Sequence, residues 1–354
     1  MRTFDYTRLA DRTWDNEIIS YISKIHEYKG KQELFLRQRP VELKRLVEIA
    51  KIQSTEASNR IEGIVTTNYR LRQLVSDKTP PRSRDEEEIL GYRNVLNLVR
   101  ENYEMIPIRS NYILQMHRDL LKYTNYSYGG QFKTTPNEID MVLENGERVV
   151  LFKPLEPYET PEAINMICES YQSALDKEVV DELILIPCFI LDFLCVHPFN
   201  DGNGRMSRLL TLLLLYRSGY LVSQFISIEK AIADTKEAYY DALQKADQGW
   251  HDEQNNPKPF IKYMLGVILA CYREFENRVK IVYESGTKST SYEIVKTYAK
   301  ERIGKFSKQD VLVGCPSLGS SSVESALKKL VEDGTLIRIG SGRKTQYARV
   351  DSAE

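Results

Sequence analysis

The stretch His197-Pro-Phe-Asn-Asp-Gly-Asn-Gly-Arg-Met-Ser-Arg208 joins a glycine-rich turn to an apolar segment. The apolar residues predict a helix from Arg205 to Ser218. The unpaired N–H groups at the start of that helix, together with its dipole, favour a phosphate in the preceding turn. Arg205 and Arg208 lie three residues apart on one helix face and carry forked donors suited to phosphate oxygens. The sequence therefore predicts a nucleoside triphosphate site at the start of a helix.

The turn itself supplies the remaining chemical groups. His197 belongs to the residue type that titrates near neutral pH, so it can accept a proton from an attacking hydroxyl. Asp201 suits Mg²⁺, which takes one or two protein carboxylates together with phosphate oxygens and water. Gly202 and Gly204 flank Asn203 and let the backbone approach an anion closely. Taken singly, these residues have ordinary structural roles, but their occurrence together favours a site. None is a covalent nucleophile, so direct in-line transfer is predicted.

Length and composition are those of an ordinary water-soluble protein. The 354 residues suffice for two or three domains, and the net charge of −1 indicates no nucleic-acid partner for the chain as a whole. The longest apolar runs, Leu183–Val196 and Leu209–Tyr216, are too short for a membrane span, and the N-terminus does not resemble a secretory signal. Because no C-x-x-C pair occurs, we expect reduced thiols in a cytoplasmic protein without a structural zinc site. The cysteines are Cys168, Cys188, Cys195, Cys271 and Cys315.

Helical periodicity dominates the chain as far as Tyr283. Thr79-Pro80-Pro81-Arg82 interrupts it and predicts a boundary between an N-terminal helical region (1–80) and a central bundle (81–284). Asn145-Gly146, between the β-prone arms of Met141–Leu151, predicts a hairpin. A lone hairpin is marginal in water, so it must pack on the bundle or pair with a partner strand. The predicted helices are Val41–Ile61, Glu86–Asn102, Ser110–Tyr123, Pro161–Lys177, Glu182–Val196, Arg205–Ser218 and Pro259–Tyr283.

After Ser285-Gly286-Thr287 the pattern changes. Two short helices (292–300 and 307–313) and a longer one (320–332) precede two strands (335–339 and 346–350), the order of a winged helix-turn-helix domain over 285–354. Residues 288–350 carry twelve Lys/Arg and six Asp/Glu, so DNA is one candidate partner. Dimerisation or docking of a protein target is the alternative role. The residues expected to face DNA are Lys328, Lys329, Arg343 and Lys344 for phosphates, and Ser320, Ser321, Ser322 and Glu324 for the major groove.

His197–Arg208 resembles the Fic family signature, H-P-F-x-[D/E]-G-N-G-R-x-x-R, at every defining position. The resemblance implies a mainly α fold: a Fic-type helical bundle with a β-hairpin flap, for which the Asn145-Gly146 hairpin stands in the right place. It also implies transfer of AMP from ATP, with Mg²⁺, to Ser, Thr or Tyr hydroxyls of a protein target. Gly204 argues against the Doc branch, which phosphorylates and typically has lysine at that position. The implied roles are general base for His197, buried anchor for Phe199, metal ligand for Asp201, anion hole for Gly202, Asn203 and Gly204, and β- and γ-phosphate contacts for Arg205 and Arg208.

Ser58-Asn59-Arg60-Ile61-Glu62-Gly63 resembles the family's inhibitory pattern, [S/T]-x-x-x-E-[G/N]. Ser58 and Glu62 are four residues apart on one helix face, and Gly63 is suited to ending the helix. The resemblance implies that Glu62 pairs with Arg208, the group needed by the γ-phosphate, so that bound ATP is misaligned. Without the resemblance, this segment would be a surface helix end with a solvated glutamate.

Other functions are compatible with the same residues. Glu62 could position a water that removes AMP, which would make the enzyme bifunctional. The chain could be a DNA-binding regulator in which the Fic core senses nucleotide, or a phosphotransferase of the Doc type. Automodification of a nearby tyrosine and a homodimer are further expectations. His26, His117 and His251 lie outside any catalytic pattern and are expected to be structural or exposed.

Overall fold

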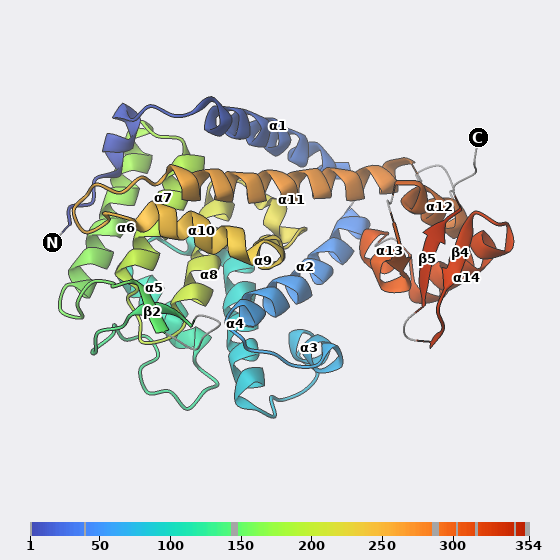
Figure 1. The fold of residues 1–354 in the computed structure, drawn as a ribbon, viewed down its shortest axis with the longest axis horizontal. Coiled ribbons are helices and arrows are strands. Elements are labelled where there is room, and N and C mark those ends of the chain that lie inside the picture. The colour runs from blue at the N-terminus through green and yellow to red at the C-terminus, as the bar shows by residue number, and fades with distance from the viewer. Residues whose placement is uncertain are drawn as a thin grey trace. The chain divides into compact units, whose positions relative to one another are not determined.

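The structure is a computed structural model that describes residues 2–38, 40–142, 148–284, 290–301, 304–315, 318–342 and 345–350. The chain forms two compact units. The first consists of Met1–Gly30 with Ala50–Cys271, and the second of Lys31–Ile49 with Tyr272–Glu354. The described residues are mainly helical, which confirms the predicted fold class (Figure 1). The domain boundaries expected after residues 80 and 284 stay predictions.

Each helix predicted for the bundle is present, with ends that shift by a few residues. Four helices were not predicted: α1, which is polar and contains Gly30, and the short helices α3, α9 and α10. The helices are α1 (Asn16–Gln38), α2 (Pro40–Ile61), α3 (Asn68–Val75), α4 (Arg84–Asn102), α5 (Ser110–Leu120), α6 (Thr160–Lys177), α7 (Glu182–Val196), α8 (Asn203–Arg217), α9 (Ile228–Asp234), α10 (Lys236–Asp247) and α11 (Lys258–Glu284). In the described part of the chain, three 3₁₀ turns accompany them: η1 (Tyr6–Asp11), η2 (Tyr103–Met105) and η3 (Leu221–Gln224).

Helices α7 and α8 form the core of the first unit. Helix α7 contacts α6 and α8, and α8 also contacts α4. Nearly every residue of α7 is buried, and α8 is buried from Arg205 to Tyr216. A helix that is apolar on all sides is stable in water only inside a protein, which explains why these two segments are the most hydrophobic runs of the sequence. The loop between them is the His197 turn.

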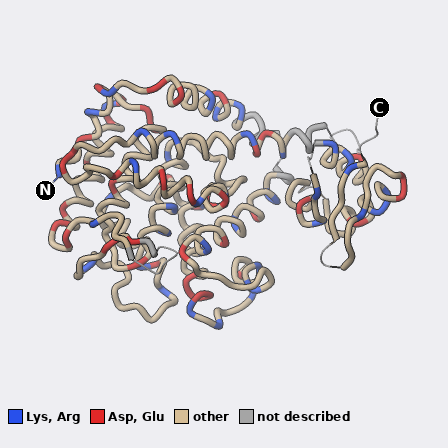
Figure 2. The backbone as a smooth tube through the Cα atoms, viewed as in Figure 1, with Lys and Arg blue, Asp and Glu red and all other residues tan. Residues whose placement is uncertain are grey.

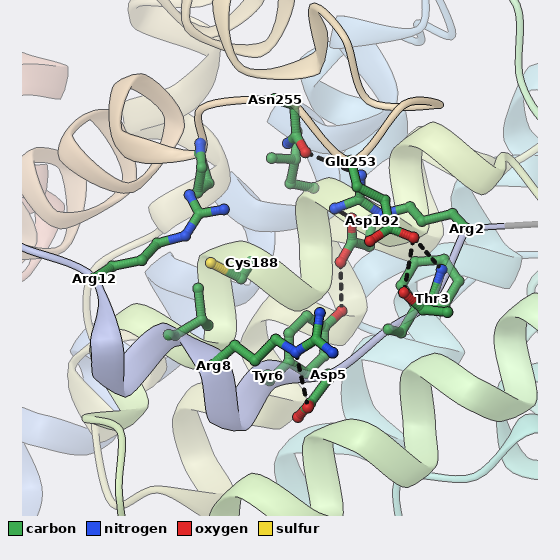
Figure 3. Close-up of a pocket in the computed structure, with 14 residues that line it drawn as sticks. Arg2, Thr3, Asp5, Tyr6, Arg8, Arg12, Cys188, Asp192, Glu253 and Asn255 are labelled. Atoms are coloured by element: carbon green, nitrogen blue, oxygen red, sulfur yellow. Dashed lines mark hydrogen bonds and ion pairs between the residues drawn. The ribbon is translucent and has the colours of Figure 1, made fainter.

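The N-terminal segment packs against α7. The Tyr6 hydroxyl donates to Asp192 Oδ2 at 2.8 Å, and Trp250 Nε1 donates to Asp192 Oδ1 at 2.7 Å. Burial raises the pKa of Asp192, while Arg2, with Nη2 3.7 Å from Oδ1, acts to lower it. Figure 3 shows Arg2, Tyr6 and Asp192 among the residues that line a cavity of about 150 Å³. Because α7 ends directly before His197, these contacts fix the helix that carries the histidine.

The predicted hairpin is present as β1 (Ile139–Val142) and β2 (Arg148–Phe152), which pair antiparallel. Its Asn145-Gly146 turn lies outside the described residues. Phe152 stacks on His251 with ring centroids 5.4 Å apart and meets Trp250 edge-on at 6.1 Å. The hairpin thus packs on the bundle, as the marginal stability of an isolated hairpin requires.

The second unit contains the three helices and the hairpin expected near the C-terminus. These are α12 (Ser291–Glu301), α13 (Lys308–Gly314), α14 (Ser320–Glu332), β4 (Leu336–Ile339) and β5 (Gln346–Arg349). A short strand that was not predicted, β3 (Phe306–Ser307), pairs with β5 and gives an antiparallel sheet of order β3-β5-β4. Val295, Val311, Val323 and Leu330 lie at the centre of its core.

The charged residues expected to contact DNA are only partly described. Lys328 and Lys329 are exposed on α14, and Lys328 Nζ lies 3.7 Å from Glu332 Oε1. Arg343 and Lys344 lie outside the described residues. In both units, Lys and Arg are scattered among Asp and Glu along the chain (Figure 2). DNA binding and a homodimer therefore stay predictions.

All five cysteines are buried and form no disulfide. None of the described helices is long and apolar enough to span a bilayer. A cytoplasmic location stays a prediction.

Candidate active site

His197 occupies the C-terminal cap of α7 in the left-handed conformation, with φ = 49°. Its N–H donates to Phe193 O at 3.0 Å, and its Nδ1 lies 3.2 Å from Leu194 O. A carbonyl only accepts, so this contact places the ring proton on Nδ1 and leaves Nε2 with a lone pair. Burial lowers the pKa of His197 to about 4. The imidazole is therefore neutral at physiological pH and ready to accept a proton at Nε2.

The turn after His197 is closed by one side chain. Asn203 Oδ1 accepts the Phe199 N–H at 2.9 Å, and Asn203 Nδ2 donates to Phe199 O at 2.7 Å. Asn137 Nδ2 donates to the same carbonyl at 3.0 Å. Phe199 is fully buried and stacks on His117, with ring centroids 3.7 Å apart. Asn203 thus holds the turn closed, while Phe199 anchors it in the core.

His117 and Lys133, which were not assigned to the site from the sequence, donate hydrogen bonds to backbone carbonyls in and beside this turn. His117 Nδ1 accepts the Gly130 N–H at 3.1 Å, so its Nε2–H donates to Asp201 O at 3.0 Å. Burial lowers the pKa of His117 to about 4, which keeps this donor pattern at neutral pH. Lys133 Nζ donates to Val196 O at 3.1 Å, and the Lys133 N–H donates to Pro198 O at 2.9 Å.

The start of α8 faces the space above the turn. Gly202 is the N-terminal cap residue and has φ = 83°, a conformation that favours glycine. The first N–H groups of a helix have no partner within it, so those following Gly202 are available to an anion. Asp201 Oδ1 accepts the Gly202 N–H at 2.5 Å, and the Asp201 side chain is 41% exposed. The carboxylate can therefore be reached from solvent at the edge of this anion-binding turn.

Arg205 points into the core rather than into solvent. Its side chain is 1% exposed, with Nη1 2.7 Å from Glu88 Oε2 and Nη2 3.5 Å from Asp201 Oδ1. Glu88 on α4 is equally buried and also pairs with Arg84 at 3.0 Å. The sequence did not predict the partnership with Glu88. Contact between Arg205 and phosphate stays a prediction.

Arg208, the last residue of His197–Arg208, contacts the Ser58–Gly63 segment. Its Nη2 lies 2.7 Å from Glu62 Oε1 and 2.9 Å from Ser58 O, and its Nε donates to Ser58 Oγ at 2.8 Å. Burial raises the pKa of Glu62 and Arg208 lowers it, with a net result below the ordinary value. Burial alone would lower the pKa of Arg208, whereas Glu62 raises it above its ordinary range. Both partners are therefore charged, and they form an ion pair.

The end of α2 places Glu62 over the start of α8. The Gly63 N–H donates to Arg60 O and the Ile64 N–H to Asn59 O, each at 3.0 Å, and Gly63 has φ = 79°. This is the Schellman arrangement, in which Glu62 is the last half-helical residue. A Cβ at Gly204 would lie 2.3 Å from Glu62 Oε1. The carboxylate thus occupies the space directly above the first turn of α8.

Comparison with known proteins agrees with this geometry. Residues 107–215 match the Fic/DOC family. The matched range includes the whole of His197–Arg208, while the Ser58–Gly63 segment lies outside it.

The relatives found by sequence carry the same family name. A protein adenylyltransferase Fic from Nematostella vectensis is 25% identical over 231 residues, which cover 63% of this chain and 48% of the relative. A protein of the same name from Culex quinquefasciatus is 27% identical over 233 residues, or 63% of this chain and 41% of the relative. This chain thus matches less than half the length of either relative.

Solved Fic structures share the fold. A Fic family protein from Desulfovibrio desulfuricans G20 aligns over 97% of this chain and 98% of its own, with a TM-score of 0.61 and 19% identity. Fic-1 from C. elegans, residues 134–508, aligns over 74% of this chain and 73% of its own, with a TM-score of 0.59 and 22% identity.

Proposed function

We propose that this protein transfers AMP from ATP to a Ser, Thr or Tyr hydroxyl of a protein target. The observation that carries the proposal is the arrangement around the start of α8. A neutral His197 with a lone pair on Nε2, an exposed Asp201 carboxylate and the buried Arg208 guanidinium all lie on this one turn and helix. The Fic/DOC match and the adenylyltransferase relatives support the same chemistry.

In the proposed reaction, His197 Nε2 accepts the proton of the target hydroxyl while the hydroxyl oxygen attacks the α-phosphorus of ATP. The bond from the α-phosphorus to the bridging oxygen breaks, and pyrophosphate leaves. The N–H groups after Gly202 stabilise the negative charge on the phosphates. Arg208 and Arg205, the latter paired with Glu88, are the proposed partners of the outer phosphates.

Asp201 is the residue that would hold Mg²⁺. Its recorded side-chain contacts, with Gly202 and Arg205, both involve Oδ1. Among the described residues, no group of three or more His, Cys, Asp or Glu side chains is placed to bind a metal ion. A single exposed carboxylate nevertheless fits Mg²⁺, because that ion commonly takes most of its ligands from nucleotide and water. When bound, the ion would neutralise phosphate charge.

We propose further that Glu62 inhibits this reaction. Its carboxylate is bound to Arg208 and lies above Gly204, in the space where an outer phosphate would lie. ATP could reach its productive position only after this pair had separated. In this scheme residues 1–80 carry the inhibitory segment, residues 81–284 carry the chemistry, and residues 285–354 form the winged helix-turn-helix domain.

The test incubates three proteins with Mg²⁺ and ATP labelled on the α- or the γ-phosphate: the wild type, Glu62→Gly and Glu62→Gly/His197→Ala. Protein labelled only from the α-position, and only in Glu62→Gly, supports AMP transfer, inhibition by Glu62 and the base role of His197 together. Label from the γ-position would instead identify a phosphotransferase. Absence of label from all three, with ATP still bound, would exclude both and favour a nucleotide-sensing regulator. Release of AMP from labelled target by the wild type would identify the bifunctional alternative.

A further inference from the structure

Three residues on α2 and just beyond its end form one stripe. Ser54, Ser58 and Glu62 are spaced four apart, so they lie on the same side. Both serines are fully buried within the helix, whereas Glu62 follows the last helical residue and its side chain is 33% exposed. Ser58 makes two of the three contacts with Arg208, and Glu62 makes only one. Arg208 is thus held by the body of the helix as well as by the inhibitory carboxylate.

The body of α2 is attached to the core at a second point. Glu229, in the first turn of α9, is fully buried and accepts three hydroxyl donors: Ser54 at 2.7 Å, Ser227 at 3.0 Å and Tyr92 at 3.0 Å. Three donors and the positive start of α9 satisfy a buried carboxylate. Ser54 therefore has a buried partner that does not involve Glu62.

The same carboxylate connects to Arg208 through Tyr92 and Ser58. Burial raises the pKa of Tyr92, so its hydroxyl stays protonated and donates to Glu229. The Tyr92 oxygen can then act as an acceptor, and the Ser58 hydroxyl acts to lower the pKa of Tyr92, as a donor to that oxygen does. Ser58 Oγ in turn accepts from Arg208 Nε. The donors therefore run in one direction from Arg208 to Glu229, an arrangement in which each bond strengthens the next.

We propose that Ser58 and Tyr92 position Arg208 for phosphate in the active form of the enzyme, and that only the end of α2 at Glu62 and Gly63 moves when inhibition is relieved. This inference rests on the proposed function. Ser58 occupies Nε and one side of Nη2, so departure of Glu62 leaves Nη1 and the rest of Nη2 to the nucleotide. Nη1 already lies toward Gly204, 3.4 Å from where a Cβ would stand. Ser58 is then a positioning residue of the open site as well as part of the closed one.

The test uses the Glu62→Gly background, in which the inhibitory pair is absent. Ser58→Ala, Tyr92→Phe and Thr55→Val are added separately, and calorimetry measures the dissociation constants of ATP and AMP. Thr55→Val is the matched control, because Thr55 is also fully buried on α2 but its Oγ1 has no hydrogen-bond partner within the described structure. Each substitution removes a single hydroxyl, and thermal unfolding verifies that the fold is retained.

We expect Ser58→Ala to reduce the preference for ATP over AMP by about tenfold, as suits one hydrogen bond to a charged group, and Tyr92→Phe by less. Thr55→Val should leave the ratio unchanged, and AMP affinity should be the same in all variants because AMP lacks the outer phosphates. A ratio in Ser58→Ala within twofold of the Thr55→Val value would overturn the proposal. The affinity ratio is measured without turnover. A lack of AMP transfer would therefore refute the proposed function without affecting the interpretation of this ratio.

Discussion

From the ion pair between Glu62 and Arg208 we predict a change in the free energy of unfolding that can be measured without turnover. Glu62→Gly leaves a guanidinium that is 3% exposed without its charged partner. Removing one partner of a fully buried pair destabilises a protein by about 3–5 kcal/mol. Here the loss is smaller, because Glu62 is a third exposed and Ser58 still accepts from Nε and Nη2. We expect about 1–2 kcal/mol, which lowers Tm by roughly 2–8 °C for a unit of this size.

Nucleotide should reverse this loss. The γ-phosphate of ATP supplies the anion that Arg208 has lost, and at a hundredfold excess over Kd a ligand adds about 2.7 kcal/mol. In the wild type, ATP must compete with Glu62, so the same concentration should raise Tm less. AMP should raise Tm equally in both proteins, since it has no outer phosphates. Glu62→Gln, which keeps the size of the side chain but not its charge, should fall between the two.

The assay is thermal unfolding of the wild type, Glu62→Gln and Glu62→Gly, each alone and with ATP or AMP. The reasoning fails if Glu62→Gly without ligand is as stable as the wild type and the two proteins gain equally from ATP. A larger gain from AMP than from ATP would also contradict it, because the outer phosphates are the groups said to replace the carboxylate.

Three further predictions follow from single contacts. Burial lowers the pKa of His197 to about 4, and Glu62 acts to raise it, so removing Glu62 should not raise this pKa. We therefore expect kcat/KM of Glu62→Gly to stay constant from pH 7 down to about 5 and to fall only at lower pH. A fall in kcat/KM near pH 6.5 would refute a neutral buried base. Asn203→Ala removes the acceptor of the Phe199 N–H, and we expect a loss of about 1–3 kcal/mol in chemical denaturation, whereas an unchanged midpoint would mean that the turn is held elsewhere. Gly63→Ala places a side chain at φ = 79°, which costs roughly 1–2 kcal/mol of backbone strain, although no atom lies within 4 Å of the new Cβ. We expect this strain to loosen the end of α2 and to raise the incorporation of AMP without any other change. Unchanged incorporation would count against movement at this point.

The geometry of the turn from His197 to Arg208 is largely predictable from the sequence because its determinants are contiguous. From His197 to Arg208 the glycines, the capping residue and the helix start interact with close neighbours, so the order of residues is enough to infer the geometry. Ser58 and Glu62 are predictable for a similar reason, since helical spacing places them on one face. Their contact with Arg208 could be inferred only from the resemblance to the Fic family.

The supporting residues could not be predicted in this way. Glu88, Tyr92 and Glu229 stand on helices with no local signature, and they matter only through partners on other helices. The sequence does not distinguish a buried glutamate from an exposed one. No neighbouring residue marks Glu229 as buried, because the three hydroxyls that it accepts are brought together only by the fold. Short helices such as α9 are missed for a related reason, because they span too few turns to show a period.

Glu62 is better suited to its partner than to its own helix. A carboxylate at the C-terminal end of α2 lies at the negative end of the helix dipole, which is unfavourable. Lys236 offsets part of this by donating to Ile61 O at 2.9 Å. The favourable interactions of the carboxylate are with Arg208 and the positive start of α8, the same two features that would attract the phosphates of ATP. Because Glu62 gains little from α2 itself and already borders solvent, an anion of higher charge can displace it without unfolding the helix. The proposed inhibition is therefore a competition between two anions for one helix start and one arginine.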